Sequence, residues 1–331
     1  MNGPRPVDKR RGIGSNGPID VIVNTTARLH RTRPDLLARM ERLARGKAVV
    51  HPTASLADLD AAVRVIAARG SDRVVFSGGD GTFMAGVTAL SRSFGDAEWP
   101  AVAFLPGGTV ATVARNWGSK SAGGGDLADR LARLIAHPAP PIPRPTLRVQ
   151  SERGPLREER IGFIFGTGLV AGFFDRYYAE GGRGLAGAAR IVARIFAESF
   201  WGGAYARSVL DPMPCTIEVE GRALDPRAFS LVCAAVVKDL GLHMMVSYRA
   251  GEDPSRVHLV ASPLSARQLG PRAPLVIAGK RIGGADHFDD LVREFAVRFP
   301  EGAEGRYVLD GDMLRADVVR VSAGPVLRVI G

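Results

Sequence analysis

The chain has 331 residues, of which 46% are hydrophobic and 24% are charged, so it is long enough for two domains with a sizeable core. Its formal net charge of +10 favours anionic partners, but the arginines are spread along the chain, which argues against a nucleic-acid-binding stripe. No apolar stretch can span a bilayer, because uncharged runs such as residues 161–174, which carry four glycines, are too short. The two cysteines lack metal-ligand spacing and no signal peptide is recognised, so we expect a protein of the reducing cytoplasm.

The first part of the chain alternates apolar strands with helices. Residues 1–18 are basic and rich in Gly and Pro, and we expect them to form a disordered arm. Strands are predicted at 20–24, 48–51, 73–77 and 101–105, and helices at 34–45, 56–69, 84–91 and 126–136. This alternation predicts an α/β domain over residues 19–137, with a parallel sheet that binds ligands at the carboxyl ends of its strands.

The pattern changes after a stiff, Pro-rich linker at residues 138–145. One amphipathic helix is predicted at 186–200, among short strands at 146–150, 215–219, 228–237, 257–261, 275–278, 318–322 and 326–330. We therefore expect a mainly β second domain over residues 146–331, whose last strands could pack back on the first domain. The fold class predicted is α/β, with a parallel-sheet domain followed by a mainly β domain.

A glycine loop follows the third predicted strand and precedes a helix. It consists of Gly78, Gly79, Asp80, Gly81 and Thr82. Adjacent glycines let backbone N–H groups approach phosphate oxygens without a Cβ clash, and the start of a helix favours anions. Asp80 can hold the loop or help position a cation, and Thr82 can cap the helix and donate to a phosphate. A simple strand-to-helix turn is the alternative, but the whole pentapeptide in this context favours phosphate binding.

This pentapeptide resembles the GGDGT signature shared by diacylglycerol, sphingosine and related lipid kinases, by NAD kinases and by phosphofructokinases. A second loop narrows the choice, because residues 105–115, LPGGTVATVAR, resemble the lipid-kinase pattern LPxGTxNDxAR. The resemblance implies that Gly107, Gly108 and Thr109 lie at the nucleotide. The family's Asn-Asp pair is replaced by Ala111 and Thr112, which removes two polar groups near the active cleft.

Two upstream residues give weaker matches. Asn24 resembles the family's strand-ending asparagine near the nucleotide, and Thr53 resembles a threonine after the second strand. Each residue could equally serve as a turn or cap residue. Further along, residues 162–175 resemble the glycine-rich strand and turn that open the family's second domain.

The third motif lies near the end of the chain. Residues 307–312, YVLDGD, resemble the family's DGE motif, with Asp312 in place of glutamate. By this resemblance Asp310 is the general base that accepts the hydroxyl proton of an alcohol. The alternative is an ordinary Asp-Gly hairpin turn. At residues 248–253 the acidic magnesium loop of many bacterial members is incomplete, so the metal ligands stay unassigned.

The resemblance extends over residues 19–330 and implies an ATP-dependent lipid kinase. Such an enzyme transfers the γ-phosphate to a lipid hydroxyl, diacylglycerol-like or sphingoid-like, with ATP and Mg²⁺ as cofactors. The implied partners are the lipid substrate and an anionic membrane surface, touched peripherally from the cytoplasm, with no nucleic acid. The predicted amphipathic helix could line the lipid site, touch the membrane or simply pack on the core. Whether the protein forms a homodimer stays open.

Two alternatives remain at this point. One is a catalytically silent nucleotide- or lipid-binding homologue, which the altered pair at Ala111 and Thr112, the replacement at Asp312 and the broken acidic loop all suggest. The other is an NAD kinase, which shares the first glycine loop. The chain has no Asn-Glu dipeptide, which NAD kinases place after that loop, so the sequence favours the lipid kinase.

Overall fold

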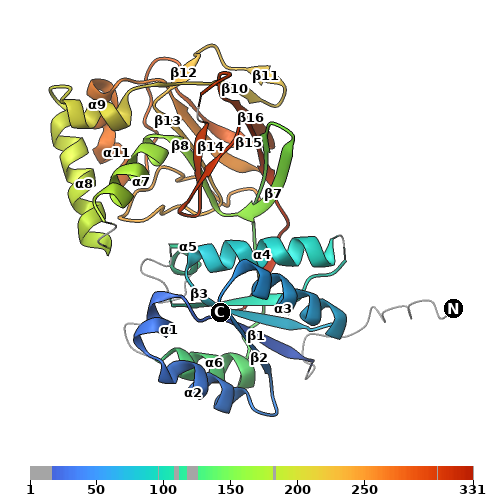
Figure 1. Cartoon of the computed structure of the whole chain (residues 1–331). Helices are drawn as coiled ribbons and strands as arrows, with labels where there is room; N and C mark the ends of the chain where they lie inside the picture. The colour runs from blue at the N-terminus through green and yellow to red at the C-terminus, as the bar shows by residue number, and fades with distance from the viewer. Residues whose placement is uncertain are drawn as a thin grey trace.

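Two lobes make up the molecule, stacked one above the other in Figure 1. The computed structural model describes residues 17–95, 97–107, 112–117, 126–181, 184–303 and 305–330. Of the predicted disordered arm, residues 1–16 lie outside the described part of the chain. Among the described helices, none is both long and apolar enough to cross a bilayer.

The first lobe is built on a six-stranded sheet in the order β2-β1-β3-β4-β20-β5, parallel except for β5. Its central strands are buried on both faces because their residues are apolar on both sides of the pleat. The strands are β1 Ile19–Asn24, β2 Val49–Thr53, β3 Arg73–Gly78, β4 Ala101–Pro106, β5 Ile142–Arg144 and β20 Leu327–Val329.

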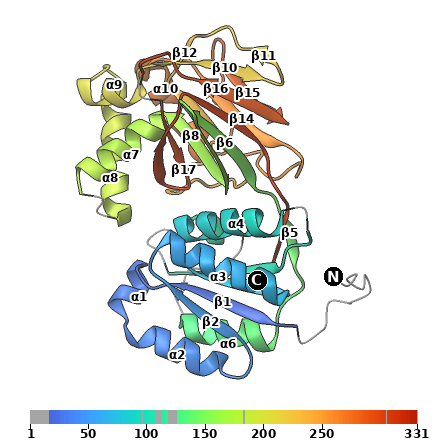
Figure 2. The same ribbon diagram turned by 45° about the vertical axis from the view of Figure 1, so that its right-hand side comes forward.

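Helices cover both faces of this sheet (Figures 1 and 2). On one face α3 and α4 bury residues such as Val63 and Phe83, and on the other α2 and α6 bury residues such as Met40 and Leu131. The helices of this lobe are α1 Arg28–Thr32, α2 Asp35–Ala44, α3 Leu56–Arg69, α4 Asp80–Phe94, α5 Thr112–Asn116 and α6 Leu127–Ala136.

The second lobe contains two six-stranded antiparallel sheets. One sheet has the order β11-β10-β16-β19-β6-β7, with β6 Leu147–Arg153, β7 Leu156–Gly162, β10 Thr216–Val219, β11 Arg222–Ala223, β16 Glu294–Arg298 and β19 Val318–Ala323. The other has the order β15-β14-β13-β8-β17-β18, with β8 Ile164–Gly168, β13 Leu231–Ala235, β14 Val257–Ser262, β15 Phe288–Val292, β17 Arg306–Leu309 and β18 Asp312–Arg315. A separate pair joins β9 Met213–Pro214 to β12 Ala228–Phe229. An α/β lobe followed by antiparallel sheets confirms the predicted fold class.

More helices accompany these sheets than the single one that the sequence predicts. They are α7 Leu169–Ala179, α8 Gly184–Ser199, α9 Ala204–Leu210, α10 Ala266–Leu269, the 3₁₀ helix η1 Gly270–Arg272 and α11 Ala273–Ile277. The predicted strand at 275–278 is wrong, because α11 occupies most of this segment. Pro274 stands in the first turn of α11, where its fixed φ suits a helix and its missing N–H costs nothing.

The two lobes share strands and core. The strand β5 falls inside the Pro-rich segment, and β20 pairs in parallel with β4 of the first sheet. One hydrophobic cluster contains Phe83 and Phe104 of the first lobe together with Phe163 and Phe165 of the second. We propose that residues 138–145 nevertheless act as the linker between the domains at 19–137 and 146–331.

Candidate active site

The first glycine loop joins the carboxyl end of β3 to the start of α4. Gly79 takes the N-cap position, and a Cβ on Gly78 would come within 2.6 Å of the Thr82 Cβ, so no side chain fits at Gly78. The Asp80 carboxylate accepts hydrogen bonds from the backbone N–H of Thr112 (2.7 Å) and of Val113 (3.3 Å). Asp80 therefore ties this loop to α5, and burial raises the pKa of its carboxyl despite those bonds.

Asn24 ends the neighbouring strand β1 and reaches the same loop. Its Nδ2 donates to Thr82 Oγ1 at 2.8 Å, and its Oδ1 accepts from the backbone N–H of Thr26 at 2.9 Å. Thr53 lies directly beside Asn24 in the parallel register of β1 and β2. Its hydroxyl donates to the Val23 carbonyl at 3.3 Å, so the structure brings Thr53 to the site with its hydroxyl already bonded to the backbone.

A cleft of about 530 Å³ opens over these residues. It lies at the carboxyl ends of β1, β2 and β3 and at the amino end of α4, where parallel α/β sheets bind ligands. The lining residues come from both lobes and are Asn24, Thr26, Ala27, Arg28, Thr53, Ala54, Ser55, Leu56, Leu59, Gly79, Gly81, Thr82, Ala85 and Asp312.

The second glycine loop begins beside the first. The Gly107 backbone N–H donates to the Gly78 carbonyl at 2.7 Å, and the Gly107 carbonyl accepts from the Leu29 N–H at 3.1 Å. Of the other residues predicted here, Gly108, Thr109 and Ala111 lie outside the described residues.

Asp310 stands at the tip of the β17–β18 hairpin, on the second lobe. Asp310 has φ of 50° and Gly311 has φ of 96°, as the two central residues of a type I′ turn require. The Asp310 carboxylate accepts from the backbone N–H of Ile164 at 2.9 Å and of Phe163 at 3.0 Å. The Asp-Gly hairpin turn that the sequence offered as an alternative is therefore present, and it holds the half-buried Asp310 against the backbone N–H groups of Phe163 and Ile164.

The two carboxyl groups at this turn have raised pKa values. Burial, and next the charge of Asp80, raise the pKa of Asp310 well above its ordinary value, although the N–H groups of Ile164 and Phe163 oppose the change. Burial also raises the pKa of Asp312, against the attraction of Arg160. A carboxyl with a raised pKa is a stronger proton acceptor once it is ionised, which suits a general base.

The position of Asp312 links the hairpin to the glycine loop. It lines the cleft together with Gly81, and a Cβ built on Gly81 would lie 3.7 Å from Asp312 Oδ1. The structure thus brings Asn24, Gly79, Gly81, Thr82 and Asp312 to one cleft. Thr53 lines it from the side, while Gly78 and Gly107 support it from beneath.

Sequence reasoning missed three side chains around the cleft. Asn116 of α5 donates from Nδ2 to the Asp239 carbonyl (2.7 Å) and accepts at Oδ1 from the Asp239 N–H (3.0 Å), which joins the two lobes. Tyr178 of α7 donates its hydroxyl to the Gly311 carbonyl at 2.8 Å. His30 of α1 is hydrogen-bonded through Nε2 to Ser77 Oγ at 2.9 Å beneath the loops. Only Asn116 had a sequence signal, since it directly follows the second motif.

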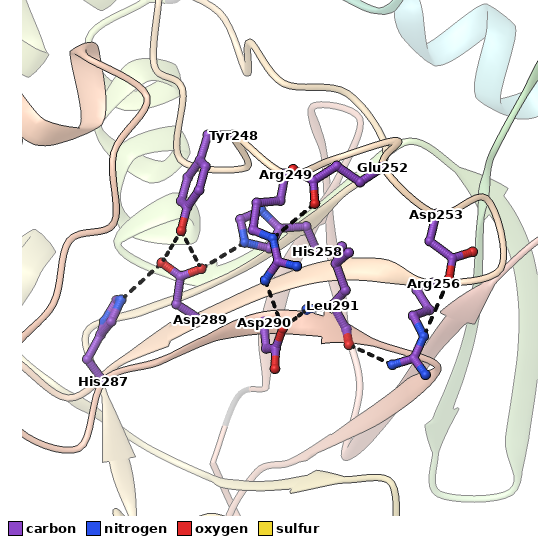
Figure 3. A network of polar contacts seen from close by, with 10 residues as sticks. All are labelled: Tyr248, Arg249, Glu252, Asp253, Arg256, His258, His287, Asp289, Asp290 and Leu291. Carbon is purple, nitrogen blue, oxygen red and sulfur yellow. Dashed lines mark hydrogen bonds and ion pairs between the residues drawn. The ribbon is translucent and has the colours of Figure 1, made fainter.

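The incomplete acidic loop forms ion pairs (Figure 3). Arg249 donates to Glu252 (3.1 Å) and to Asp290 (2.8 Å), and Arg256 pairs with Asp253 at 3.5 Å. The carboxylates that could bind a cation in this loop are thus paired with arginines. Among the described residues, no group of three or more His, Cys, Asp or Glu side chains could hold a metal ion.

A buried polar cluster lies next to that loop (Figure 3). Asp289 accepts from Tyr248 at 3.2 Å, and its oxygens lie 2.9 Å from His258 Nε2 and 3.5 Å from His287 Nε2. Burial alone would raise the pKa of Asp289, but the bonds and charges of His258 and His287 outweigh it and hold this pKa below its usual range. The cluster links the segment that carries Tyr248 to the edge strand β15 and to its neighbour β14.

Comparison with known proteins agrees with this fold. Residues 18–140 match the family model described as diacylglycerol kinase catalytic domain. Three solved structures from Bacillus anthracis str. Sterne, described as diacylglycerol kinases, two of them provisionally, have the same fold. Their TM-scores are 0.64, 0.62 and 0.59 at 16%, 15% and 14% identity, and the alignments cover 94–95% of this chain and 96–97% of theirs. No curated protein matches the chain.

Proposed function

We propose that this chain, whose residues 18–140 match the family model described as diacylglycerol kinase catalytic domain, is an ATP-dependent kinase of a lipid hydroxyl. The observation that carries this proposal is the meeting of two elements from different lobes. The glycine loop at the start of α4 faces the Asp310 hairpin across one cleft, with Asp312 and Gly81 on its two sides.

In this proposal the nucleotide phosphates lie at the first glycine loop. Gly79 and Gly81 leave room for phosphate oxygens, the α4 N-terminus supplies N–H groups and a favourable dipole, and Thr82 donates from its hydroxyl. Asn24 orients Thr82 by donating to its Oγ1, so that the hydroxyl hydrogen can point into the cleft.

The acceptor hydroxyl enters from the side of the hairpin. Asp310, once ionised, takes the hydroxyl proton while the alcohol oxygen attacks the γ-phosphorus and the bond to the departing ADP oxygen breaks. The raised pKa of Asp310 makes it a better proton acceptor than an exposed aspartate. The lipid acceptor, diacylglycerol-like or sphingoid-like, is implied by the family and by the apolar and aromatic residues of α7 beside the hairpin.

Mg²⁺ fits this site as a companion of the nucleotide. A magnesium ion in kinases is bound mainly by phosphates and waters and needs only one or two protein carboxylates. Asp312 is the carboxylate that lines the cleft, whereas Asp80 is engaged by two backbone N–H groups. When bound, the ion would neutralise phosphate charge. A thermal shift caused by Mg²⁺ with a non-hydrolysable ATP analogue, and lost in Asp312→Ala, would test this role without turnover.

A catalytically silent homologue is the second candidate. The chain has Thr112 where the family has the Asp of its Asn-Asp pair, and Asp80 bonds the backbone N–H of that same residue. If catalysis needs the carboxylate that the family has at the position of Thr112, this protein would bind ATP without transferring phosphate.

One assay separates the candidates. The protein is incubated with radiolabelled ATP and Mg²⁺, with extracted membrane lipids in one arm and NAD⁺ in another, and labelled products are identified by mass. We expect label in a lipid phosphate monoester. Label in NADP⁺ would indicate an NAD kinase, and ATP binding with no labelled product in any arm would indicate a silent homologue.

A further inference from the structure

The outward face of α8 carries exposed apolar residues and two exposed arginines, and it has no exposed acid. The helix buries Gly187, Ala188, Ile191, Ile195 and Ser199 against the second lobe, as an amphipathic helix does. Its opposite side exposes small and apolar residues and ends in two aromatic rings. These residues, which we name the α8 stripe, are Leu185, Ala189, Ala193, Ala197, Phe200 and Trp201.

The ends of the α8 stripe are too exposed for core residues. Leu185 is 42% exposed, Phe200 is 51% exposed and Trp201 is 65% exposed. The single acid of the helix, Glu198, accepts from Arg194 at 2.9 Å and from the Tyr205 N–H at 3.0 Å, so its charge is already engaged. Arg190 and Arg194 flank the stripe with side chains that are 63% and 57% exposed.

A basic segment adjoins the aromatic end of the stripe. Residues 254–285 contain no Asp or Glu, and Arg267, Lys280 and Arg281 are exposed on it. The stem of Arg267 packs on the turn after Trp201, since a Cβ on Gly202 would lie 3.3 Å from Arg267 Cδ. The first residue of η1 packs directly on the last turn of α8, because a Cβ on Gly270 would overlap Ser199. The same segment exposes the apolar residue Ile277 (52%).

We propose that the α8 stripe and this basic segment dock on a bilayer that contains anionic phospholipids. An interfacial helix lies in the membrane plane, with apolar and aromatic side chains among the acyl chains and cations at the headgroups, and the stripe has this arrangement. Clustered Lys and Arg residues are attracted to the negative surface potential of such a bilayer. A second copy of the chain fits less well, because its own arginines would face these cations.

The other end of α8 gives the docking an orientation. The Gly184 N–H donates to the Tyr177 hydroxyl at 3.1 Å, and the adjacent Tyr178 bonds the Gly311 carbonyl of the Asp310 turn. A helix that lies flat on the bilayer would therefore hold this turn near the headgroups, where a lipid hydroxyl is found. Only this orientation rests on the proposed function; the docking itself does not.

Vesicle binding tests the docking without ATP and so independently of kinase activity. The full chain is mixed with phosphatidylcholine vesicles, with or without phosphatidylglycerol, and binding is followed by co-sedimentation. In the parent, tryptophan fluorescence should also shift to the blue, and the variant Trp201→Phe shows how much of that shift comes from Trp201 rather than from Trp99 and Trp117. We expect binding to the anionic vesicles to be at least about tenfold stronger, and to weaken as salt is raised. The double variant Phe200→Ser/Trp201→Ser should lose at least about tenfold in partitioning.

Two further variants make the test specific. Leu156→Ser removes a side chain that is equally exposed, at 65%, on the β6–β7 hairpin and should bind like the parent. Arg267→Glu/Lys280→Glu should abolish the preference for anionic vesicles while leaving the melting temperature unchanged. The proposal is overturned if the Phe200/Trp201 double variant partitions like the parent, if the parent binds neither vesicle type, or if that variant instead dissociates a dimer in sedimentation velocity.

Discussion

No neighbouring protein atom would clash with a side chain at Gly81. A Cβ at Gly78 would collide with Thr82, so packing alone explains that glycine, whereas a Cβ at Gly81 would meet nothing closer than Asp312 Oδ1 at 3.7 Å. Gly81 lies in the first turn of α4, where a glycine has no conformational advantage over alanine. The space beside Gly81 is part of the cleft, so the missing side chain leaves room for a ligand.

Gly81→Val should therefore keep the fold and lose the nucleotide. We expect a melting temperature within a few degrees of the parent and ATP affinity lowered at least about tenfold, because the new side chain fills space meant for phosphate oxygens. Calorimetric titration with ATP measures the affinity. Gly78→Ala is the contrasting variant and should lose stability as well. Parent-like ATP affinity in a folded Gly81→Val protein would remove this loop from the nucleotide site.

The charge of Asp312 should affect the pH dependence of the proposed phosphate transfer. If Asp310 is the general base, it must be ionised, so activity should fall as the pH drops through the pKa of Asp310, which burial, Asp80 and then Asp312 all raise. Asp312→Asn removes one of these negative charges and should move the acid limb of kcat/KM to lower pH. The exposed carboxyl variant Glu301→Gln should leave the limb in place. An acid limb that stays fixed in Asp312→Asn would contradict the electrostatic account.

At the scale of elements, the short helix α5 connects three parts of the site. Its first backbone N–H groups hold Asp80 of the glycine loop, and its last residue, Asn116, forms two hydrogen bonds to the backbone of Asp239. Asp239 belongs to the second lobe, so α5 fixes the position of the glycine loop relative to that lobe. Asn116 is in this sense a positioning residue.

Asn116→Ala should lower turnover more than it lowers stability. Loss of both hydrogen bonds lets α5 and the glycine loop shift relative to the hairpin, and small misplacements of reacting groups cost about ten- to a hundredfold in rate. We expect kcat to fall by that amount with KM for ATP little changed. Asp239→Ala is the matched control, because the bonds use only the backbone of Asp239. Equal kinetic loss in both variants would show that these bonds do not position the site.

Some elements could be predicted from sequence and others could not, for physical reasons. The strand β3 and the loop after it are local features, since an apolar run ends at paired glycines before a helix, and the structure has both. The apolar run Leu275 to Ile277 has no clear period, so the sequence favours a strand there, although Pro274 stands in the first turn of a helix. The glycine-rich residues 162–175 include β8 and the first part of α7, and burial along α7 follows no single face, since Ala171 is buried and Tyr178 is exposed.

In the candidate site, too, the sequence predicts some residues and misses others. Motif residues at strand ends were identifiable, and the structure places Asn24, Gly81 and Thr82 at one cleft. The contacts of Asn116 and of Asp310 join residues more than a hundred positions apart and use backbone groups, so no side-chain pattern signals them. The roles proposed for these residues stay predictions until they are measured.

At the scale of the whole molecule, an aromatic chain crosses from one lobe to the other. Phe83 stacks on Phe104 with ring centroids 4.4 Å apart, Phe104 stacks on Trp117 at 5.6 Å, and Trp117 meets Phe163 edge-on at 5.2 Å. Together with the return of β20 to the first sheet, these ring contacts connect the cores of the two lobes.

We therefore expect a single unfolding transition for both lobes. In urea, backbone hydrogen exchange of β3 in the first lobe and of β13 in the second should report the same midpoint. Phe163→Ala should destabilise both together by about 3–5 kcal/mol, the usual cost of removing a buried phenylalanine ring. Two separate midpoints in the parent protein would show that the lobes fold independently.

We propose that phosphate passes from ATP to a lipid with Asp310 as the base. Asp310→Asn is the sharpest change, because asparagine tolerates the positive φ of the turn and keeps the size of the side chain. Transfer of label from ATP to lipid extract is measured for the parent and for this variant, alongside ATP affinity. For Asp310→Asn we expect unchanged ATP binding and a rate of phosphate transfer about two to four orders of magnitude lower, the usual contribution of general-base catalysis. Transfer at the parent rate by Asp310→Asn would contradict the proposal.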